Sequence, residues 1–175
     1  ICITTFNRGK RVLENIPHYL NKLGNECQIL ILDNASVKES EAYRAVLDKT
    51  KNISSLKYLR KNANNQMQGN FFDCFVYSNT DYVMVLSDED IPNNIEIKEA
   101  IIFLKNNPNI GVFKGSMTPM PSVPSKNSII NESKIYEKGY DAITSFGIWN
   151  NYISGTIYNT KIFKKCNLKH IFQKN

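Results

Sequence analysis

The sequence predicts an α/β fold in which helices cover both faces of an open, mostly parallel β-sheet. Two observations carry this prediction. Short β-rich runs alternate with amphipathic segments through residues 1–115, and the first four of these runs end in polar clusters. Strand–helix–strand alternation gives right-handed crossovers and therefore parallel strands. A chain of 175 residues has room for one full hydrophobic core, so we expect a single domain over residues 1–175.

Six runs have the composition of β-strands. Residues 28–33 are apolar enough to be buried on both faces, as is typical of a central parallel strand. β-Branched and aromatic residues favour extended structure in the other runs, at residues 1–5, 55–59, 82–86, 110–113 and 151–158.

Apolar side chains recur at helical spacing between these strands. Leu13, Ile16, Leu20 and Leu23 mark the first helix, which ends at Gly24. The same spacing predicts further helices around residues 43–47, 72–76 and 97–104. Residues 117–127 contain three prolines and no periodicity, so we expect a long loop there.

Composition limits the classes of function. The net charge of +6 suits an anionic partner such as a phosphorylated ligand, a membrane surface or nucleic acid. The basic residues are scattered, however, and the strongest polar cluster is acidic, so we do not expect nucleic-acid binding.

Cys2, Cys27, Cys74 and Cys166 form no CxxC pair, which argues against a zinc site and favours buried thiols in a reducing cytosol. No apolar run approaches the length of a membrane span. Because the chain opens without Met on a strand-like run, we expect it to be part of a longer polypeptide.

Polar residues follow each of the first four strands. Since the carboxyl ends of parallel strands meet at one edge of a sheet, and ligands bind in the crevice outside that edge, four clusters there predict one composite site. Each cluster alone is also compatible with a turn or a helix cap. The clusters are Thr-Phe-Asn-Arg at residues 5–8, Asp-Asn-Ala-Ser at 33–36, Arg-Lys-Asn at 60–62 and Ser-Asp-Glu-Asp at 87–90.

The acidic cluster favours a hard metal ion. In an extended segment the carboxylates of Asp88 and Asp90 project to one side and that of Glu89 to the other. Mg²⁺ commonly uses one or two carboxylates together with substrate phosphates. The two outer acids therefore predict a metal site that bridges a diphosphate.

The remaining clusters suit the other parts of a nucleotide. Arg8, Arg60 and Lys61 could neutralise phosphates, Phe6 offers a flat face for stacking, and Asp33 could accept an N–H from a nucleobase. The first strand is not followed by GxGxxG, and the Arg-Gly-Lys at residues 8–10 lacks the earlier glycine of a P-loop. A dinucleotide dehydrogenase and a P-loop ATPase are therefore not expected.

The four polar clusters, taken in their order along the chain, resemble the motifs of the family 2 glycosyltransferases, whose nucleotide-sugar domain has the GT-A fold. The resemblance covers about residues 1–115. It rests on Ile-Thr-Thr-Phe-Asn-Arg at residues 3–8, Ile-Leu-Ile-Leu-Asp-Asn-Ala-Ser at 29–36, Tyr-Leu-Arg-Lys-Asn at 58–62 with Asn65 and Gly69-Asn70, and the strand at 81–90 that delivers an Asp-x-Asp motif. It implies a nucleotide-sugar-binding half over residues 1–115 and an acceptor-side half over 116–175.

The resemblance also implies roles for particular residues. Asp88 would lie near the ribose and the metal, and Asp90 would ligate Mg²⁺ or Mn²⁺ together with the donor diphosphate. Trp149 and Tyr152 would face the acceptor, although core aromatics of a strand explain them equally well. The implied donor-binding residues are Thr5, Phe6, Arg8, Asp33, Asn62, Asn65, Asn70 and Asp88.

The implied reaction is a single displacement with inversion, in which a carboxylate base takes a proton from the acceptor hydroxyl. The family's base is often part of a Glu-Asp pair, and no such pair follows residue 90. Asp141 is the only later aspartate and is a candidate, although it could equally cap or solvate a short helix. A base outside this chain is the other alternative.

We therefore expect a bacterial glycosyltransferase of polysaccharide biosynthesis. It would take a nucleotide-sugar donor, with a UDP-sugar favoured, and a saccharide, lipid-linked or protein acceptor. The resemblance implies a cytoplasmic location, with peripheral association at the inner face of the cell membrane. A noncatalytic nucleotide-sugar-binding domain and a nucleotidyltransferase are the alternatives.

Overall fold

The described part of the chain forms one six-stranded sheet. In this computed structural model residues 1–23, 27–115, 134–147 and 153–165 are described. The strand order is β3-β2-β1-β4-β6-β5, and β1 to β4 are parallel to one another. The mostly parallel sheet predicted from the sequence is thus confirmed. The strands are β1 (Cys2–Thr5), β2 (Ile29–Asp33), β3 (Leu56–Arg60), β4 (Tyr82–Ser87), β5 (Val112–Lys114) and β6 (Thr156–Asn159).

The last strand departs from the simple alternation. β6 lies between β4 and β5 and is antiparallel to both. It begins at Thr156, five residues later than expected from the apolar run, because the chain turns at Gly155, whose φ is 75°. A positive φ is easily adopted by glycine and rarely by other residues. The insertion of β6 separates β5 from β4, which sequence alternation alone would have paired.

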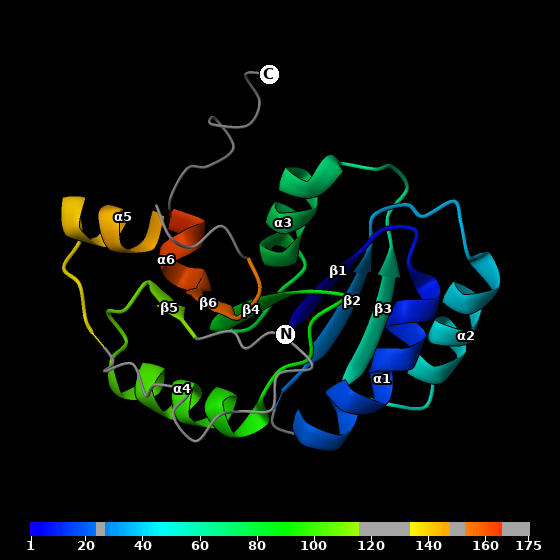
Figure 1. Ribbon diagram of the computed structural model, residues 1–175, viewed down its shortest axis with the longest axis horizontal. Helices are drawn as coiled ribbons and strands as arrows, with labels where there is room; N and C mark the ends of the chain where they lie inside the picture. Colours follow the sequence, from blue (N-terminus) through cyan, green and yellow to red (C-terminus); the bar gives the residue numbers. More distant parts are fainter. Residues whose placement is uncertain (24–26, 116–133, 148–152, 166–175) are drawn as a thin grey trace, which may run out of the picture.

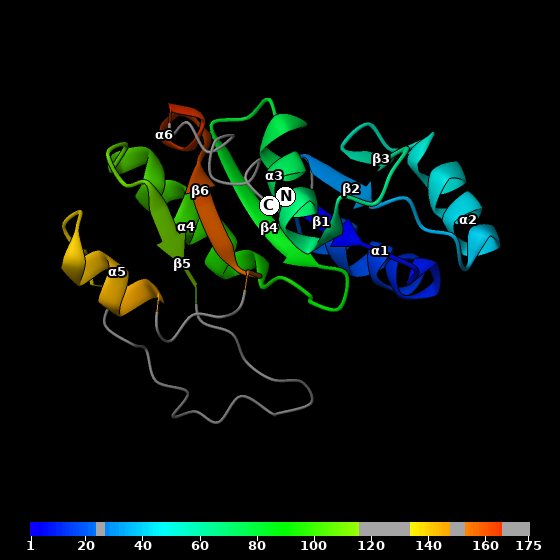
Figure 2. The same ribbon diagram turned by 90° about the horizontal axis from the view of Figure 1, so that it is seen from above.

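Helices cover both faces of this sheet, as predicted (Figures 1 and 2). Helices α1, α2 and α4 contribute to the hydrophobic cluster on one face, and α3 and α6 to the cluster on the other. Side chains alternate along β1, so that Ile3 belongs to the first cluster and Cys2 to the second. The helices are α1 (Gly9–Leu23), α2 (Ser40–Thr50), α3 (Gln66–Val76), α4 (Asn94–Asn106), α5 (Tyr140–Gly147) and α6 (Thr160–Lys165).

Aromatic packing holds α6 against α3. The rings of Phe75 and Phe163 are stacked, with centroids 3.6 Å apart, and Phe71 and Tyr158 meet this pair edge-on. Aromatic pairs of this kind stabilise a core by about 0.5–1.5 kcal/mol beyond the area they bury. The contact ties the segment that follows β6 to the helix that follows β3.

Three of the four cysteines lie among the described residues. Cys2 and Cys74 are buried free thiols and Cys27 is half-buried, whereas Cys166 lies outside the described residues. None of the described helices combines the length and apolar character needed to cross a lipid bilayer.

Candidate functional site

The parallel strands bring the four polar clusters to one edge of the sheet. Thr5 is in register with Asp33 and Asp33 with Arg60, while Thr4 is paired with Ser87 on the other side of β1. The clusters that follow these strand ends therefore lie side by side, although they come from segments far apart in the sequence. The composite edge expected from the sequence is present in the fold.

Asp88, directly after β4, is the most constrained acid at this edge. Its amide donates to the Thr4 carbonyl at 3.2 Å, and its Oδ1 accepts from Nη1 of Arg8 at 3.2 Å. Only 3% of its side chain is exposed. Among the residues that the structure describes, none provides a hydrogen-bond partner for its buried Oδ2. A buried carboxylate oxygen without a partner is costly, which marks it as a place where a ligand would complete the site.

Arg8 lies between the acidic cluster and solvent. Its guanidinium forms ion pairs with Asp88 and with Glu89, and about half of its side chain (52%) is exposed. An arginine in this position retains donors that are free to bind a phosphate, since its guanidinium carries five N–H groups. Phe6, two residues earlier, is 40% exposed and so leaves part of its ring accessible.

Asp33 differs from Asp88 in that both of its carboxylate oxygens have hydrogen-bond partners. It is fully buried, and its Oδ1 accepts from the amide of Ser36 at 2.9 Å and from the Ser36 hydroxyl. Its Oδ2 accepts from the Tyr58 hydroxyl at 2.7 Å and lies 3.8 Å from Nε of Arg60. Burial, together with this carboxylate, raises the pKa of Tyr58 and keeps its hydroxyl a donor. The expected contact of Asp33 with a nucleobase stays a prediction, and because Asp33 is fully buried it requires the neighbouring side chains to shift.

Tyr43 of α2 is a site residue that sequence reasoning missed. Its hydroxyl lies 2.9 Å from the Thr5 hydroxyl and accepts from the Arg8 amide at 3.0 Å. Tyr43 therefore anchors the loop between β1 and α1 that carries Phe6 and Arg8. In the sequence Tyr43 reads as one apolar position of a helix, and no signal distinguishes it from an ordinary core residue.

Lys61 does not lie where the sequence predicted. We expected it to neutralise donor phosphates, but its side chain is only 5% exposed and its Nζ lies 2.5 Å from Oδ2 of Asp73. The Nδ2 of Asn65 donates to the same carboxylate oxygen at 3.0 Å. A buried ammonium requires an anion close by, and α3 supplies it. Lys61 therefore ties the end of β3 to α3 instead of facing the open edge.

The asparagines in and after the third cluster are divided between surface and interior. Asn62 is exposed, and the amide of Asn65 donates to Oδ1 of Asn34 at 3.0 Å. Asn70 is buried in α3, and within the described ranges its Oδ1 finds no hydrogen-bond partner. Their expected contacts with the donor stay predictions.

The acidic turn offers two carboxylates, which is fewer ligands than a metal site made of protein groups alone would have. No group of three His, Cys, Asp or Glu side chains suited to a metal ion exists in the described part of the chain. Asp88 nevertheless presents its unpaired oxygen, and Asp90 follows it in a turn in which the Asp90 amide donates to the Ser87 carbonyl at 3.1 Å. One or two carboxylates with phosphate oxygens are the usual ligands of Mg²⁺, so this donor set is adequate only together with a phosphorylated ligand.

Among the acceptor-side candidates, only Asp141 is described, and it is not brought to this edge. Asp141 is exposed on α5, which lies at the opposite end of the molecule from α2 and β3 (Figures 1 and 2). Between the described residues, no hydrogen bond or ion pair joins it to Asp88 or Asp90. Trp149 and Tyr152 lie outside the described residues.

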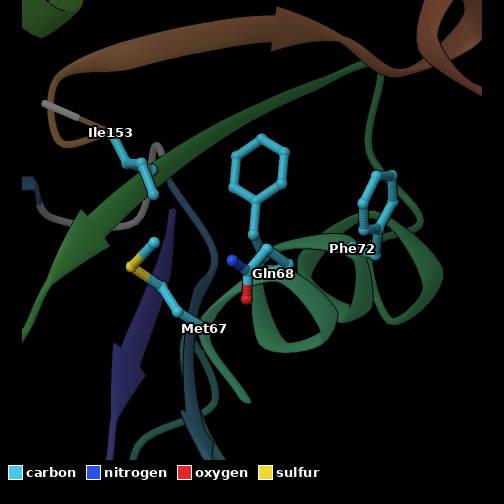
Figure 3. Close-up of a pocket in the computed structure, with 5 residues that line it drawn as sticks. Met67, Gln68, Phe72 and Ile153 are labelled. Carbon is cyan, nitrogen blue, oxygen red and sulfur yellow. The ribbon is translucent and has the colours of Figure 1, made fainter. Parts of the chain in front are cut away.

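A small apolar pocket adjoins α3 (Figure 3). It has a volume of about 120 Å³ and is lined by Met67, Gln68, Phe71, Phe72 and Ile153. No ionisable side chain lines this pocket, so it brings no acid, base or nucleophile to the polar edge.

An open, mostly parallel sheet with an acidic turn and an arginine at its carboxyl edge defines a GT-A-type α/β domain. The chain belongs to glycosyl transferase family 2, whose family model matches residues 1–166. A comparison with curated proteins found no match.

Solved structures of S. aureus TarS share this fold. TarS 1–349 matches with a TM-score of 0.68 and 16% identity, over 94% of this chain and 47% of that one. Its complex with UDP-GlcNAc gives the same TM-score and identity, over 94% and 46%, and its complex with UDP over 94% and 47%. The chain thus spans about half the length of the structures it matches.

Proposed function

We propose that this chain is the donor-binding part of a metal-dependent glycosyltransferase that moves a sugar from a nucleotide-diphosphate donor to a saccharide, lipid-linked or protein acceptor. Membership of glycosyl transferase family 2 supports sugar transfer. The observation that carries the donor site is Asp88, a buried carboxylate with one oxygen held by Arg8 and the other without a partner among the described residues. The TarS complexes with UDP-GlcNAc and UDP favour a uridine nucleotide.

Each residue at the edge has a distinct role in this proposal. Phe6 stacks on the base through its exposed face, and Arg8 orients the diphosphate through the donors it does not use on Asp88. Asp88 and Asp90 hold the divalent cation, Mg²⁺ or Mn²⁺. When bound, that cation would neutralise charge on the diphosphate leaving group.

The inverting course of the reaction requires a base that takes the proton from the acceptor hydroxyl. Asp141 is the candidate within this chain, but it is exposed on α5 away from the polar edge, so this role would require α5 to approach the bound donor. Asp141→Asn would abolish transfer and leave UDP binding intact if Asp141 is the base. Retention of transfer in that variant would place the base elsewhere.

Calorimetric titration of UDP in Mn²⁺ and then in EDTA tests the donor site. We expect binding that requires the metal and is lost in Asp90→Ala. Asp81→Ala is the matched control, because Asp81 precedes β4 at the opposite end of the same strand and is exposed, and its loss changes the net charge equally. Binding of GDP in place of UDP would change only the donor. Absence of binding with every nucleotide would refute the donor site.

A noncatalytic donor-binding domain is the second candidate. The observation that favours it is the absence, among the described residues, of an acid linked to the polar edge from the acceptor side. Such a domain would bind UDP-sugar with metal but release no UDP over time. A coupled assay for UDP release therefore separates the two functions.

A further inference from the structure

We propose that Asn15 and Tyr19 of α1 are positioning residues for Asp88, and that they fix its backbone so that the buried, unpaired carboxylate oxygen is held in one position at the edge. The inference rests on the proposed function, because it concerns the same acid. It assigns a role at the donor site to the buried face of a helix that contributes none of the four polar clusters.

Both side chains reach the same atom. Nδ2 of Asn15 donates to the Asp88 carbonyl at 2.9 Å, and the Tyr19 hydroxyl approaches the same carbonyl oxygen at 3.5 Å. The two residues are four positions apart on α1, which puts them on one face of the helix one turn above the other. Two donors from one helix thus converge on one backbone oxygen of the loop that follows β4.

The side-chain amide of Asn15 is a polar group on the buried, apolar face of α1. Asn15 is 6% exposed and lies between Val12 and Ile16, which are both buried in the apolar cluster under the sheet. Burying an amide there is costly unless it is hydrogen-bonded, and an apolar residue would fill the position without that cost. The hydrogen bond that Nδ2 donates leaves the helix and ends on Asp88, 73 residues further along the chain.

Tyr19 supplies the second of these donors from the interior of the protein. Its side chain is fully buried, and its hydroxyl lies 3.5 Å from the Asp88 carbonyl oxygen that Asn15 also contacts. Asn15 and Tyr19 therefore act together on one backbone atom of Asp88.

These bonds complete the immobilisation of Asp88. Its amide is fixed by Thr4, its carbonyl by Asn15 and Tyr19, and its Oδ1 by Arg8. Three of its four polar groups are therefore set by the fold, and Oδ2 is the remaining one. A protein oxygen that is held within a fraction of an ångström binds a metal ion more strongly than a mobile oxygen does, because it has already been ordered during folding.

The test compares UDP binding in Mn²⁺ and in EDTA for wild type, Asn15→Leu and Tyr19→Phe. Ile16→Val is the control, since it removes one methyl group from the same helix and core without touching Asp88. We expect the Mn²⁺-dependent affinity to fall about 10- to 100-fold in Asn15→Leu, as is usual for partners of metal ligands, and less in Tyr19→Phe. We expect the control to bind as wild type does. Amide hydrogen exchange should accelerate at residues 87–90 in Asn15→Leu and not in the control.

The outcomes separate this inference from the proposed function. If wild type binds and Asn15→Leu binds equally well, the positioning role is refuted and the donor site stands. Equal losses in Asn15→Leu and Ile16→Val at equal thermal stability would also refute it, because the effect would then be general destabilisation. Wild-type protein that binds no nucleotide would refute both. Tyr19→Phe removes a single oxygen and serves as the test if Asn15→Leu does not fold.

Discussion

Replacing either partner of the Lys61–Asp73 pair should lower the free energy of unfolding, and replacing Asp73 should lower it more than replacing Lys61. The pair joins the end of β3 to α3, with Nζ and Oδ2 2.5 Å apart and side-chain exposures of 5% for Lys61 and 19% for Asp73. The ammonium is thus more completely removed from water than the carboxylate. Removing the carboxylate should therefore cost more than removing the ammonium.

The structure gives the magnitudes. Asp73→Asn would leave a buried cation without an anion, which costs about 3–5 kcal/mol of unfolding free energy. Lys61→Met would leave an acid that still accepts from Asn65 and reaches some water, so we expect about 2–3 kcal/mol. The double variant Lys61→Met/Asp73→Asn should lose less than the sum, since neither charge is then left alone.

Urea denaturation of the wild type, the two single variants and the double variant measures this cycle, and UDP titration of the folded variants measures ligand binding. We expect Lys61→Met to bind UDP as wild type does, because its charge is spent within the fold. A Lys61→Met protein of unchanged stability that has lost UDP binding would overturn the reasoning and return Lys61 to the phosphates. Lys51→Met is the control, since Lys51 pairs with Asp48 on an exposed surface.

Two further predictions concern the edge and the helix beneath it. Phe6→Ala should weaken UDP binding about tenfold or more with little change in stability, since base stacking contributes about 1–3 kcal/mol, whereas Val37→Ala, at an exposed position nearby, should bind as wild type does in the same titration. Because burial raises the pKa of Tyr19 to about 12, the unfolded chain loses this proton above pH 10 and the folded chain retains it, so the contribution of Tyr19 is present below pH 10 and about 2–3 kcal/mol is lost by pH 12. Urea midpoints between pH 8 and 11 should fall less steeply in Tyr19→Phe, and parallel curves for the two proteins would contradict this.

Periodicity and turn chemistry predicted the elements of residues 1–115 well. The apolar run at residues 82–86 became β4 (Tyr82–Ser87), and the run at 28–33 became β2 (Ile29–Asp33). Such runs are informative because a strand buried on both faces must be apolar throughout. The position of the polar edge followed from them, since parallel strands place all their carboxyl ends on one side.

The parts that could not be predicted depend on pairing between distant segments. β6 enters the sheet between β4 and β5, and its pairing is decided by contacts that no local pattern encodes. Tyr43 and Asn15 read as a core aromatic and a helix polar residue, yet their hydrogen bonds end on β1 and on Asp88. Lys61 read as a free cation at a strand end, and its partner lies in the next helix. Sequence gives the type of each group, and only the fold gives its partner.

The two aspartates at the edge show what this distinction means for function. Asp33 is the last residue of β2 and Asp88 directly follows β4, and both acids are buried. Both carboxylate oxygens of Asp33 have partners in Ser36 and Tyr58, so this acid holds its own loop in place, and its contact with a nucleobase stays a prediction. Asp88 is fixed just as firmly, but one of its oxygens has no partner within the described part of the chain. Since a buried carboxylate oxygen is stable only when something completes it, the fold has paid the cost of ordering Asp88 in advance of its ligand. Asp88 is therefore the acid from which a donor site would be built, and Asp33 is the one that keeps the wall of that site rigid.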